Sequence, residues 1–465
     1  MEDQERPFQT IRQLARLLRA GEISPTELTR LSLERLNSIG RTLNAVVRLT
    51  PDRAEREAMV AEAELRAGID RGPLHGIPYG AKDILATAGI PTTWGAAPFQ
   101  QQVFPYDAAV VRRLHDAGAI LVAKLATVEL AGGMTYGHPN ASFTGPAINP
   151  WNREAWAGGS SSGPAVAVAA GLVPFAIGSD TGGSITIPAA YCGVSGFRPT
   201  FGRVSRYGTM TISWTLDRLG PLCRTADDCG SVLQTIAGAD PRDPSTVNRP
   251  YEYQQHPRRD HGFRFAIIGG ATDGIQPAVR ENFEGSLRIL GDVGTIEEVR
   301  LPIYPYDEVF DTILAAESYS AFQEFVEEGH ILQLTSQQGR VHRLAAMVLP
   351  AHQYLRAQRI RRQISVAVGA ITSSYDALVS PTIGVVASGL DQDFQFMVPG
   401  AFPEPTNLMG NLTGTPTITV PNGFGEGGLP TALQFTGSAF GDNRVLDAAR
   451  AFQERTAWHS QHPST

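Results

Sequence analysis

The chain has few cysteines, almost no lysine and no long apolar run. Its cysteines, Cys192, Cys223 and Cys229, form neither a CxxC pair nor a cysteine–histidine spacing, so we expect neither a disulfide framework nor a metal site. No stretch approaches the roughly 18 apolar residues of a membrane span. Residues 1–6 are mostly charged and lack the apolar core of a signal peptide, so we expect a cytoplasmic protein.

The charge is also low and evenly spread. The 465 residues carry a formal net charge of −7, with acidic and basic side chains scattered along the chain. Such a balance argues against general affinity for nucleic acid or for an anionic membrane. With 42% hydrophobic residues the chain can bury a large core, and we predict one integrated domain over residues 1–465.

Lysine is the scarcest basic residue. Only Lys82 and Lys124 are lysines among the 39 basic residues, and all the others are arginines. Arginine cannot lose its proton inside a protein, whereas a desolvated lysine can and then serves as a base. Lys82 lies in the glycine-flanked, apolar stretch 74–85, where burial would lower its pKa. The alternative for Lys82 is a structural ion pair with Asp83 or another carboxylate.

Two glycine-serine loops lie close together in the sequence, at 158–163 and 178–184. Between them, Pro164 occupies the position of a first helical residue, and 164–170 reads as a buried helix closed by Gly171. Residues 172–177 read as a buried strand, after which 178–183 turn sharply. We expect this helix and strand to bring the two loops near each other.

The hydroxyls of these loops suit nucleophilic catalysis. A serine beside a neutral lysine becomes a nucleophile, and a second serine can relay the proton. Ser184 ends the second loop and Ser160 lies in the first. The backbone N–H groups of Thr181, Gly182 and Gly183 can point at one oxyanion, because glycine permits the geometry of an anion-binding nest.

The remaining pattern alternates helices and strands, which is typical of an α/β fold. Residues 10 to about 67 have helical spacing, and Ser24 with Glu27 forms a capping box followed by proline. Further helices are expected at 110–117, 225–237 and 307–370, and strands at 120–124, 263–270, 377–382, 417–421 and 433–437.

These residues resemble the amidase signature family over nearly the whole chain. The matching segments are 76–83, 149–151, 158–161, 178–184, 188–193, 196–200, 414–416 and 428–434. The resemblance implies an α/β fold in a single domain, with a central twisted mixed β-sheet covered by helices on both faces. It divides the domain into N-terminal helices at 1–70, a catalytic core at 71–240 and, at 263–465, the rest of the sheet, a helical region and C-terminal pocket loops.

The resemblance also implies the chemistry. The family's catalytic triad falls on Lys82, Ser160 and Ser184, with Ser184 as the acylated nucleophile, Ser160 as the relay after a cis peptide bond and Lys82 as the base. The N–H groups from Thr181 to Ser184 would form the oxyanion hole. The implied reaction is hydrolysis of a linear amide by water, without cofactor or metal, and the chain could form a homodimer.

Substrate-binding residues follow from the same resemblance. They are Gly133, Met134, Thr135, Tyr136 and Gly158. An aromatic and apolar cluster of Phe394, Phe396, Met397 and Phe402 between glycines and prolines reads as a pocket loop, with core packing as the alternative. We expect an apolar or aryl-tolerant pocket that accepts small aryl or hydrophobic amides, with carbamates (urethanes) as a further class.

Two residues near the expected site depart from the family pattern. Ser162 stands where glycine is usual, and Thr186 stands where arginine is common. Thr186 removes a side chain with five hydrogen-bond donors, so the way Asp180 is held becomes a question. We expect an altered pocket with catalysis retained.

Three other functions remain open at this point. Residues 159–163 satisfy the G-x-S-x-G pattern of an esterase with Ser161 as nucleophile, which would need a histidine such as His75 or His138. An amidotransferase A-type subunit would release ammonia for a partner protein, although the region 317–362 does not resemble the corresponding part of that protein. The third is a catalytically silent binding protein.

Overall fold

One mixed sheet of eleven strands organises the part of the chain that the computed structural model describes, residues 5–132, 137–255, 261–392, 401 and 406–464. Its strand order is β1-β3-β2-β4-β6-β5-β10-β11-β9-β7-β8. The strands are β1 (Val46–Leu49), β2 (Pro78–Lys82), β3 (Ile120–Leu125), β4 (Phe175–Asp180), β5 (Ser195–Arg198), β6 (Arg218–Cys223), β7 (Phe263–Ile268), β8 (Gly294–Val299), β9 (Ala377–Pro381), β10 (Thr417–Phe424) and β11 (Pro430–Thr436).

Parallel pairing is confined to two parts of the sheet. β2 is parallel to β3 and to β4, and at the other end β7 is parallel to β8 and to β9. The remaining neighbours, including β4 with β6 and β10 with β11, are antiparallel. The loops that follow β2 and β4 therefore leave the sheet at the same edge, which brings the ends of these two strands together.

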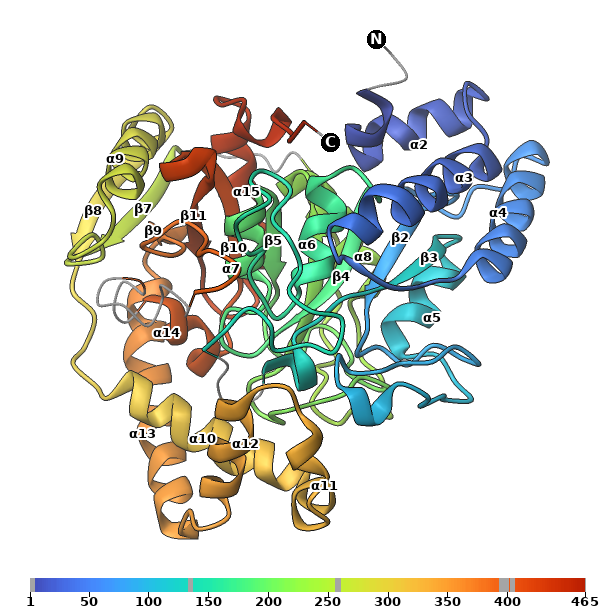
Figure 1. The fold of residues 1–465 in the computed structure, drawn as a ribbon. Helices are drawn as coiled ribbons and strands as arrows, with labels where there is room; N and C mark the ends of the chain where they lie inside the picture. Colours follow the sequence, from blue (N-terminus) through green and yellow to red (C-terminus); the bar gives the residue numbers. More distant parts are fainter. Residues whose placement is uncertain (1–4, 133–136, 256–260, 393–400, 402–405, 465) are drawn as a thin grey trace.

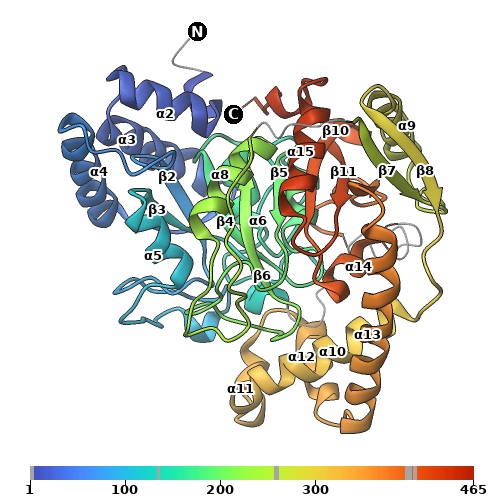
Figure 2. The same ribbon diagram turned by 180° about the vertical axis from the view of Figure 1, so that it is seen from behind.

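Helices cover both faces of the sheet (Figures 1 and 2). Along β4, Phe175 and Ile177 belong to one apolar core and Ala176 to a second, because successive side chains of a strand point to opposite faces. The helices that add apolar residues to the first core include α2 (Ile11–Ala20), α5 (Ala109–Asp116), α8 (Ala226–Ile236), α9 (Pro277–Gly291) and α15 (Asp442–Gln453). Those of the second include α4 (Pro51–Arg66), α6 (Ser162–Ala169) and α7 (Thr186–Cys192), beside which α3 (Pro25–Arg35) packs.

A group of helices extends beyond the sheet, past the ends of its strands, at the bottom of Figure 1. Two carboxylates connect these helices to the rest of the fold. Glu317 of the helical group accepts from the Thr215 N–H at 3.0 Å, and Glu129 accepts from the N–H of Thr335 in the helical group at 2.9 Å. The helices are α10 (Tyr306–Ala321), α11 (Gln323–Glu327), α12 (Gln337–Ala346) and α13 (Ala351–Thr372), with α14 (Thr406–Thr413) packed on α13.

The predicted fold class is confirmed, and so is the capping box, in which Ser24 and Glu27 exchange hydrogen bonds. Three local predictions were wrong. Strand β1 interrupts the expected helical region at 10–67. Pro164 is the third helical residue and not the first, because α6 already begins at Ser162. Residues 178–180 continue β4, so the turn starts only after Asp180. Among the described residues, no helix is long and apolar enough to cross a membrane.

Candidate active site

Lys82 is the last residue of β2 and is fully buried. Its Nζ donates to Ser160 Oγ at 2.7 Å and to Ser179 Oγ at 2.9 Å. Ser179 lies near the end of the neighbouring parallel strand β4, which explains why its hydroxyl meets the amine. The adjacent Asp83 carboxylate lies beside Lys124 instead, at 3.0 Å. The expected alternative of a Lys82–Asp83 ion pair is therefore wrong.

Burial is the main influence on this amine. Burial lowers the pKa of Lys82 to about 7, and the negative charges of Asp180 and Asp217 oppose that shift only in part. The described hydrogen-bond partners of Nζ are hydroxyls, and neither compensates a positive charge as a carboxylate would. A large fraction of the amine is therefore neutral at neutral pH.

The two glycine-serine loops lie side by side. The Ser161 N–H donates to the Ser184 carbonyl at 3.1 Å, and the peptide bond between Gly159 and Ser160 is cis. Ser160 is fully buried, whereas Ser184 is half-buried. No hydrogen bond joins the hydroxyls of Ser160 and Ser184 within the described structure. The backbone contact between the two loops thus joins Ser161 to Ser184, while the Ser160 hydroxyl contacts the Lys82 amine.

Asp180 anchors the turn that carries Ser184. Its carboxylate accepts from the N–H groups of Gly183 at 3.0 Å and Ile185 at 2.8 Å, and it also binds Arg198 and Asn411. Burial alone would raise the pKa of Asp180, but Arg198 and these N–H donors outweigh it and lower the pKa to about 2. The carboxylate is charged throughout the physiological range and holds the turn firmly.

The turn itself presents backbone donors. The Gly183 N–H is already engaged by Asp180, while the N–H groups of Gly182 and Ser184 donate to no acceptor among the described residues. Gly183 has φ of +105°, which a side chain would disfavour. A Cβ at Gly182 would lie 2.7 Å from the Phe310 ring of α10, so this helix closely covers the turn.

Comparison with known proteins decides the family. The family model described as Amidase matches residues 27–446. The chain belongs to the amidase family. Its members hydrolyse C–N bonds of amides, and this chain is an enzyme of that class.

Three relatives are instructive. The A subunit of glutamyl-tRNA(Gln) amidotransferase from Methylococcus capsulatus is 36% identical over 489 residues, which covers 98% of each chain. The solved peptide amidase of Stenotrophomonas maltophilia has a TM-score of 0.83 and 31% identity, and the match covers 96% of this chain and 97% of that one. A bacterial aryl acylamidase shares the fold, with a TM-score of 0.87 at 24% identity and 97% coverage of both chains.

The other predicted binding residues of this amidase divide into two groups. Gly158 is buried with φ of +81°, and a Cβ there would lie 2.9 Å from the Pro188 Cα, so the position has no room for a side chain. The others lie outside the described residues: Gly133, Met134, Thr135 and Tyr136, together with Phe394, Phe396, Met397 and Phe402.

Ser161 does not have the surroundings of an esterase nucleophile. It is fully buried, and its hydroxyl donates to the Ser179 carbonyl and accepts from the Ser179 N–H. His75 is buried beside Glu64 and accepts from the Arg71 N–H. The geometry therefore disfavours the G-x-S-x-G alternative.

Thr186 leaves Asp180 well held. Its N–H donates to Asp180 Oδ2 at 3.4 Å and its hydroxyl to the Gly183 carbonyl at 3.3 Å. Arg198 from β5 and Asn411 from α14 provide the side-chain donors to the carboxylate. The sequence analysis missed Asn411 and Ser179, because their partners come from distant strands and helices.

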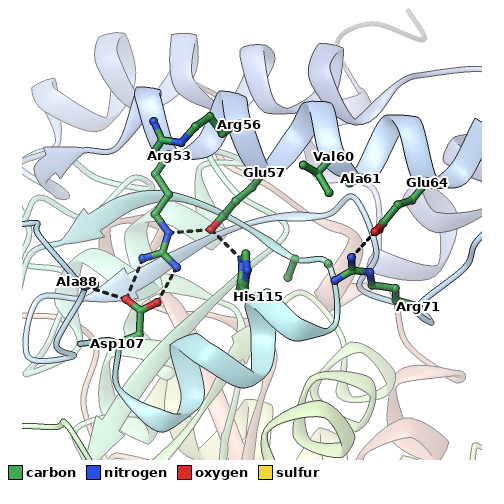
Figure 3. A pocket seen from close by; sticks show the side chains of 12 residues that line it. Arg53, Arg56, Glu57, Val60, Ala61, Glu64, Arg71, Ala88, Asp107 and His115 are labelled. Carbon is green, nitrogen blue, oxygen red and sulfur yellow. Dashed lines mark hydrogen bonds and ion pairs between the residues drawn. The ribbon is translucent and has the colours of Figure 1, made fainter. Parts of the chain in front are cut away.

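Two surface pockets differ in character. A pocket of about 470 Å³ beside α4 and α5 is lined by charged side chains that pair with one another, such as Arg53 with Asp107 and Glu57 with His115 (Figure 3). None of the predicted catalytic residues lines it, and its ion pairs connect secondary-structure elements. An aromatic groove of about 550 Å³ includes Trp94, Tyr207, Trp214 and Phe322, and the predicted catalytic residues are not among its lining residues either. No group of three or more His, Cys, Asp or Glu side chains suited to a metal occurs in the described ranges.

Proposed function

We propose that the enzyme hydrolyses a linear amide through an acyl-enzyme on Ser184, with Lys82 as the base and Ser160 as the proton relay. The observation that carries the proposal is the 2.7 Å contact between Lys82 Nζ and Ser160 Oγ, which both belong to fully buried residues. A lysine whose pKa is about 7 is poised to accept a proton at neutral pH.

The proposed steps conserve every proton. Ser184 Oγ attacks the amide carbonyl carbon while its proton passes to Ser160 Oγ, and the Ser160 proton passes to Lys82 Nζ. Collapse of the tetrahedral intermediate breaks the C–N bond, and the proton held by Lys82 returns through Ser160 to the leaving amine. Water then attacks the Ser184 ester and gives one proton through Ser160 to Lys82. Collapse breaks the bond between the acyl carbon and Ser184 Oγ, and that proton returns through Ser160 to Ser184 Oγ as the acid leaves.

The turn before Ser184 is the proposed oxyanion site, formed by Thr181, Gly182, Gly183 and Ser184. The free N–H groups of Gly182 and Ser184 support this role, while the Gly183 N–H is held by Asp180. Loss of one such donor costs on the order of 10²- to 10³-fold in kcat in comparable sites.

For the substrate we propose a small aryl or hydrophobic amide, with carbamates as the neighbouring class. The aromatic groove supports this choice, because Thr211 and Trp214 line it and belong to the segment 211–217. Asp217 of this segment accepts a hydrogen bond from Thr181, the first residue of the proposed oxyanion turn. Aromatic walls favour flat, apolar groups.

A second candidate is an amidotransferase A-type subunit that releases ammonia for a partner protein. The 36% identity with the Methylococcus protein over 98% of both chains favours it, and that alignment is long enough to include most of the region 317–362. Glutamine would then be the preferred amide, and a second protein would remain bound during purification. Hydrolysis of anilides by the isolated chain, with glutamine inert, would reject this candidate.

The test is a substrate panel of nitroanilides, aliphatic amides, glutamine and carbamates, with wild type and the alanine variants of Lys82, Ser160 and Ser184. Ser184→Ala should abolish both turnover and labelling by a sulfonyl fluoride. Labelling that persists at another serine would overturn the assignment of the nucleophile. Exclusive turnover of short aliphatic amides would contradict the proposed substrate class.

A further inference from the structure

Asp217 is a buried carboxylate that the proposed reaction does not yet use. It immediately precedes β6, and only 7% of it is exposed. Its Oδ1 accepts from the Thr181 hydroxyl at 2.7 Å. Its Oδ2 accepts from the N–H groups of Ile212 at 2.7 Å and Ser213 at 3.1 Å. One carboxylate therefore joins the segment 212–217 to the first residue of the turn that leads to Ser184.

Thr181 is the natural place to hold this turn. The next two residues, Gly182 and Gly183, have no side chains by which a neighbour could fix them. Thr181 is held at both ends, because Asn411 donates to its carbonyl while its hydroxyl donates to Asp217. The direction of the Gly182 N–H depends on the peptide unit that Thr181 begins, which Asn411 holds at its carbonyl and Asp217 holds through the Thr181 side chain.

We propose that Asp217 is a positioning residue for amide hydrolysis, which holds Thr181 and so aims the oxyanion turn. This inference rests on the proposed function, because it assumes that the turn binds the developing oxyanion. A small misplacement of such a donor is costly, since a shift of about 1 Å in a catalytic geometry can reduce the rate about 10²-fold.

Asp217 also affects Lys82, and this gives a second readout. Its negative charge, with that of Asp180 from β4, favours the protonated form of Lys82. The other described contacts of this amine are the Ser160 and Ser179 hydroxyls. Burial raises the pKa of Asp217 itself to about 6, against the Thr181 and Ser213 hydrogen bonds and the charge of Arg206. At pH 7 and above Asp217 is therefore mostly charged.

The decisive variants are Thr181→Val, Thr181→Ser and Asp217→Asn, assayed with 4-nitroacetanilide from pH 6 to pH 9. Thr181→Val removes the hydroxyl and should lower kcat by about 30- to 100-fold with little change in KM. Thr181→Ser keeps the hydroxyl and should restore most of that loss. Asp217→Asn should lower kcat as well and also move the acid limb of kcat/KM to lower pH, because Lys82 then loses a neighbouring negative charge.

A matched control comes from the same segment. Thr215 donates its hydroxyl to Glu317 at 2.9 Å, a bond of the same kind that leads to α10 and away from the turn. Thr215→Val should keep kcat within about threefold, which separates loss of the turn contact from general loosening of the segment.

The outcomes distinguish this inference from the proposed function. Full activity in Thr181→Val, or an unchanged kcat and pH profile in Asp217→Asn, would overturn the positioning role of Asp217. An inactive Ser184→Ala variant would in that case still support Ser184 as the nucleophile. Activity retained by Ser184→Ala would overturn the proposed function itself. If Asp217→Asn does not fold, the comparison of Thr181→Val with Thr181→Ser tests the positioning role, because these two variants differ only in the hydroxyl that donates to Asp217 and in one methyl group.

Discussion

The two lysines of this amidase form an informative pair, because both are fully buried but their partners differ. Lys82 donates to the hydroxyls of Ser160 and Ser179. Lys124, on the adjacent strand β3, lies 3.0 Å from the Asp83 carboxylate and donates to the Leu85 carbonyl at 2.8 Å and to Thr92 Oγ1.

Burial lowers the pKa of both amines, but the opposing interactions are different. For Lys124, the charge of Asp83 and its hydrogen bond act directly against desolvation. For Lys82, only the charges of Asp180 and Asp217 do so, and the pKa falls to about 7. The comparison shows that burial lowers the pKa of a lysine, while a carboxylate in direct contact favours the charged amine. We therefore assign Lys82 to chemistry and Lys124 to structure.

The largest expected effect is on turnover. Lys82→Met should lower kcat by on the order of 10³-fold, because the proton of Ser184 then has no acceptor. The fold should remain intact, since the hydroxyls that Lys82 contacts are uncharged. Anilide kinetics and thermal unfolding measure the two quantities. A stable variant with more than a tenth of wild-type kcat would remove Lys82 from the role of base.

Lys124→Met should show the opposite pattern. It leaves the buried Asp83 charge without its cation, and breaking such a pair costs about 3–5 kcal/mol of unfolding free energy. Urea unfolding monitored by circular dichroism measures this loss. The double variant Lys124→Met/Asp83→Asn serves as the control and should recover part of it. A Lys124→Met protein as stable as wild type would show that the pair contributes nothing to the fold.

The next effect is the pH dependence of kcat/KM, which reports on the protonation of Lys82. Because burial lowers the pKa of Lys82 to about 7, the amine is mostly neutral above pH 7 and protonated below it. A protonated amine cannot accept the Ser184 proton, so kcat/KM should fall about tenfold per pH unit below pH 7. The profile from pH 5.5 to pH 9 tests this, and a flat profile would contradict a Lys82 base that titrates near pH 7.

The smallest effects come from removing one hydroxyl from each amine. Ser179→Ala removes one hydrogen-bond partner of Lys82 and should lower kcat by about three- to tenfold with stability nearly unchanged. Thr92→Val removes a partner of Lys124 and should cost about 1 kcal/mol of stability with kcat nearly unchanged. Equal effects of the two variants on kcat and on stability would contradict the assignment of Lys82 to chemistry and Lys124 to structure.

The candidate residues around Lys82 could be predicted from the sequence, whereas no role was predicted for Lys124. Two lysines among many arginines, with glycine-serine loops downstream, were enough to select Lys82, Ser160 and Ser184 as candidates. The fold class followed from the alternation of helices and strands and from the resemblance to the family. These features depend on short-range patterns, which a sequence displays directly.

The remainder depended on contacts between distant segments. Strand β6 contains Gly220 and Pro221, which normally argue against a central strand, but its neighbours β4 and β5 secure it. Asp217 comes just before this strand, and its partner Thr181 is 36 positions away in the chain. No local pattern predicts such a pairing, so the sequence analysis missed both the strand and the carboxylate.

The most direct test uses the scarcity of lysine itself. Protein labelled with ¹³Cε-lysine contains only two labelled side chains, Lys82 and Lys124, and the Lys82→Met variant assigns their signals. We predict that the Lys82 signal titrates with a midpoint near pH 7 while the Lys124 signal keeps its charged position across that range. A Lys82 signal that remains in the charged position up to pH 9 would contradict the account.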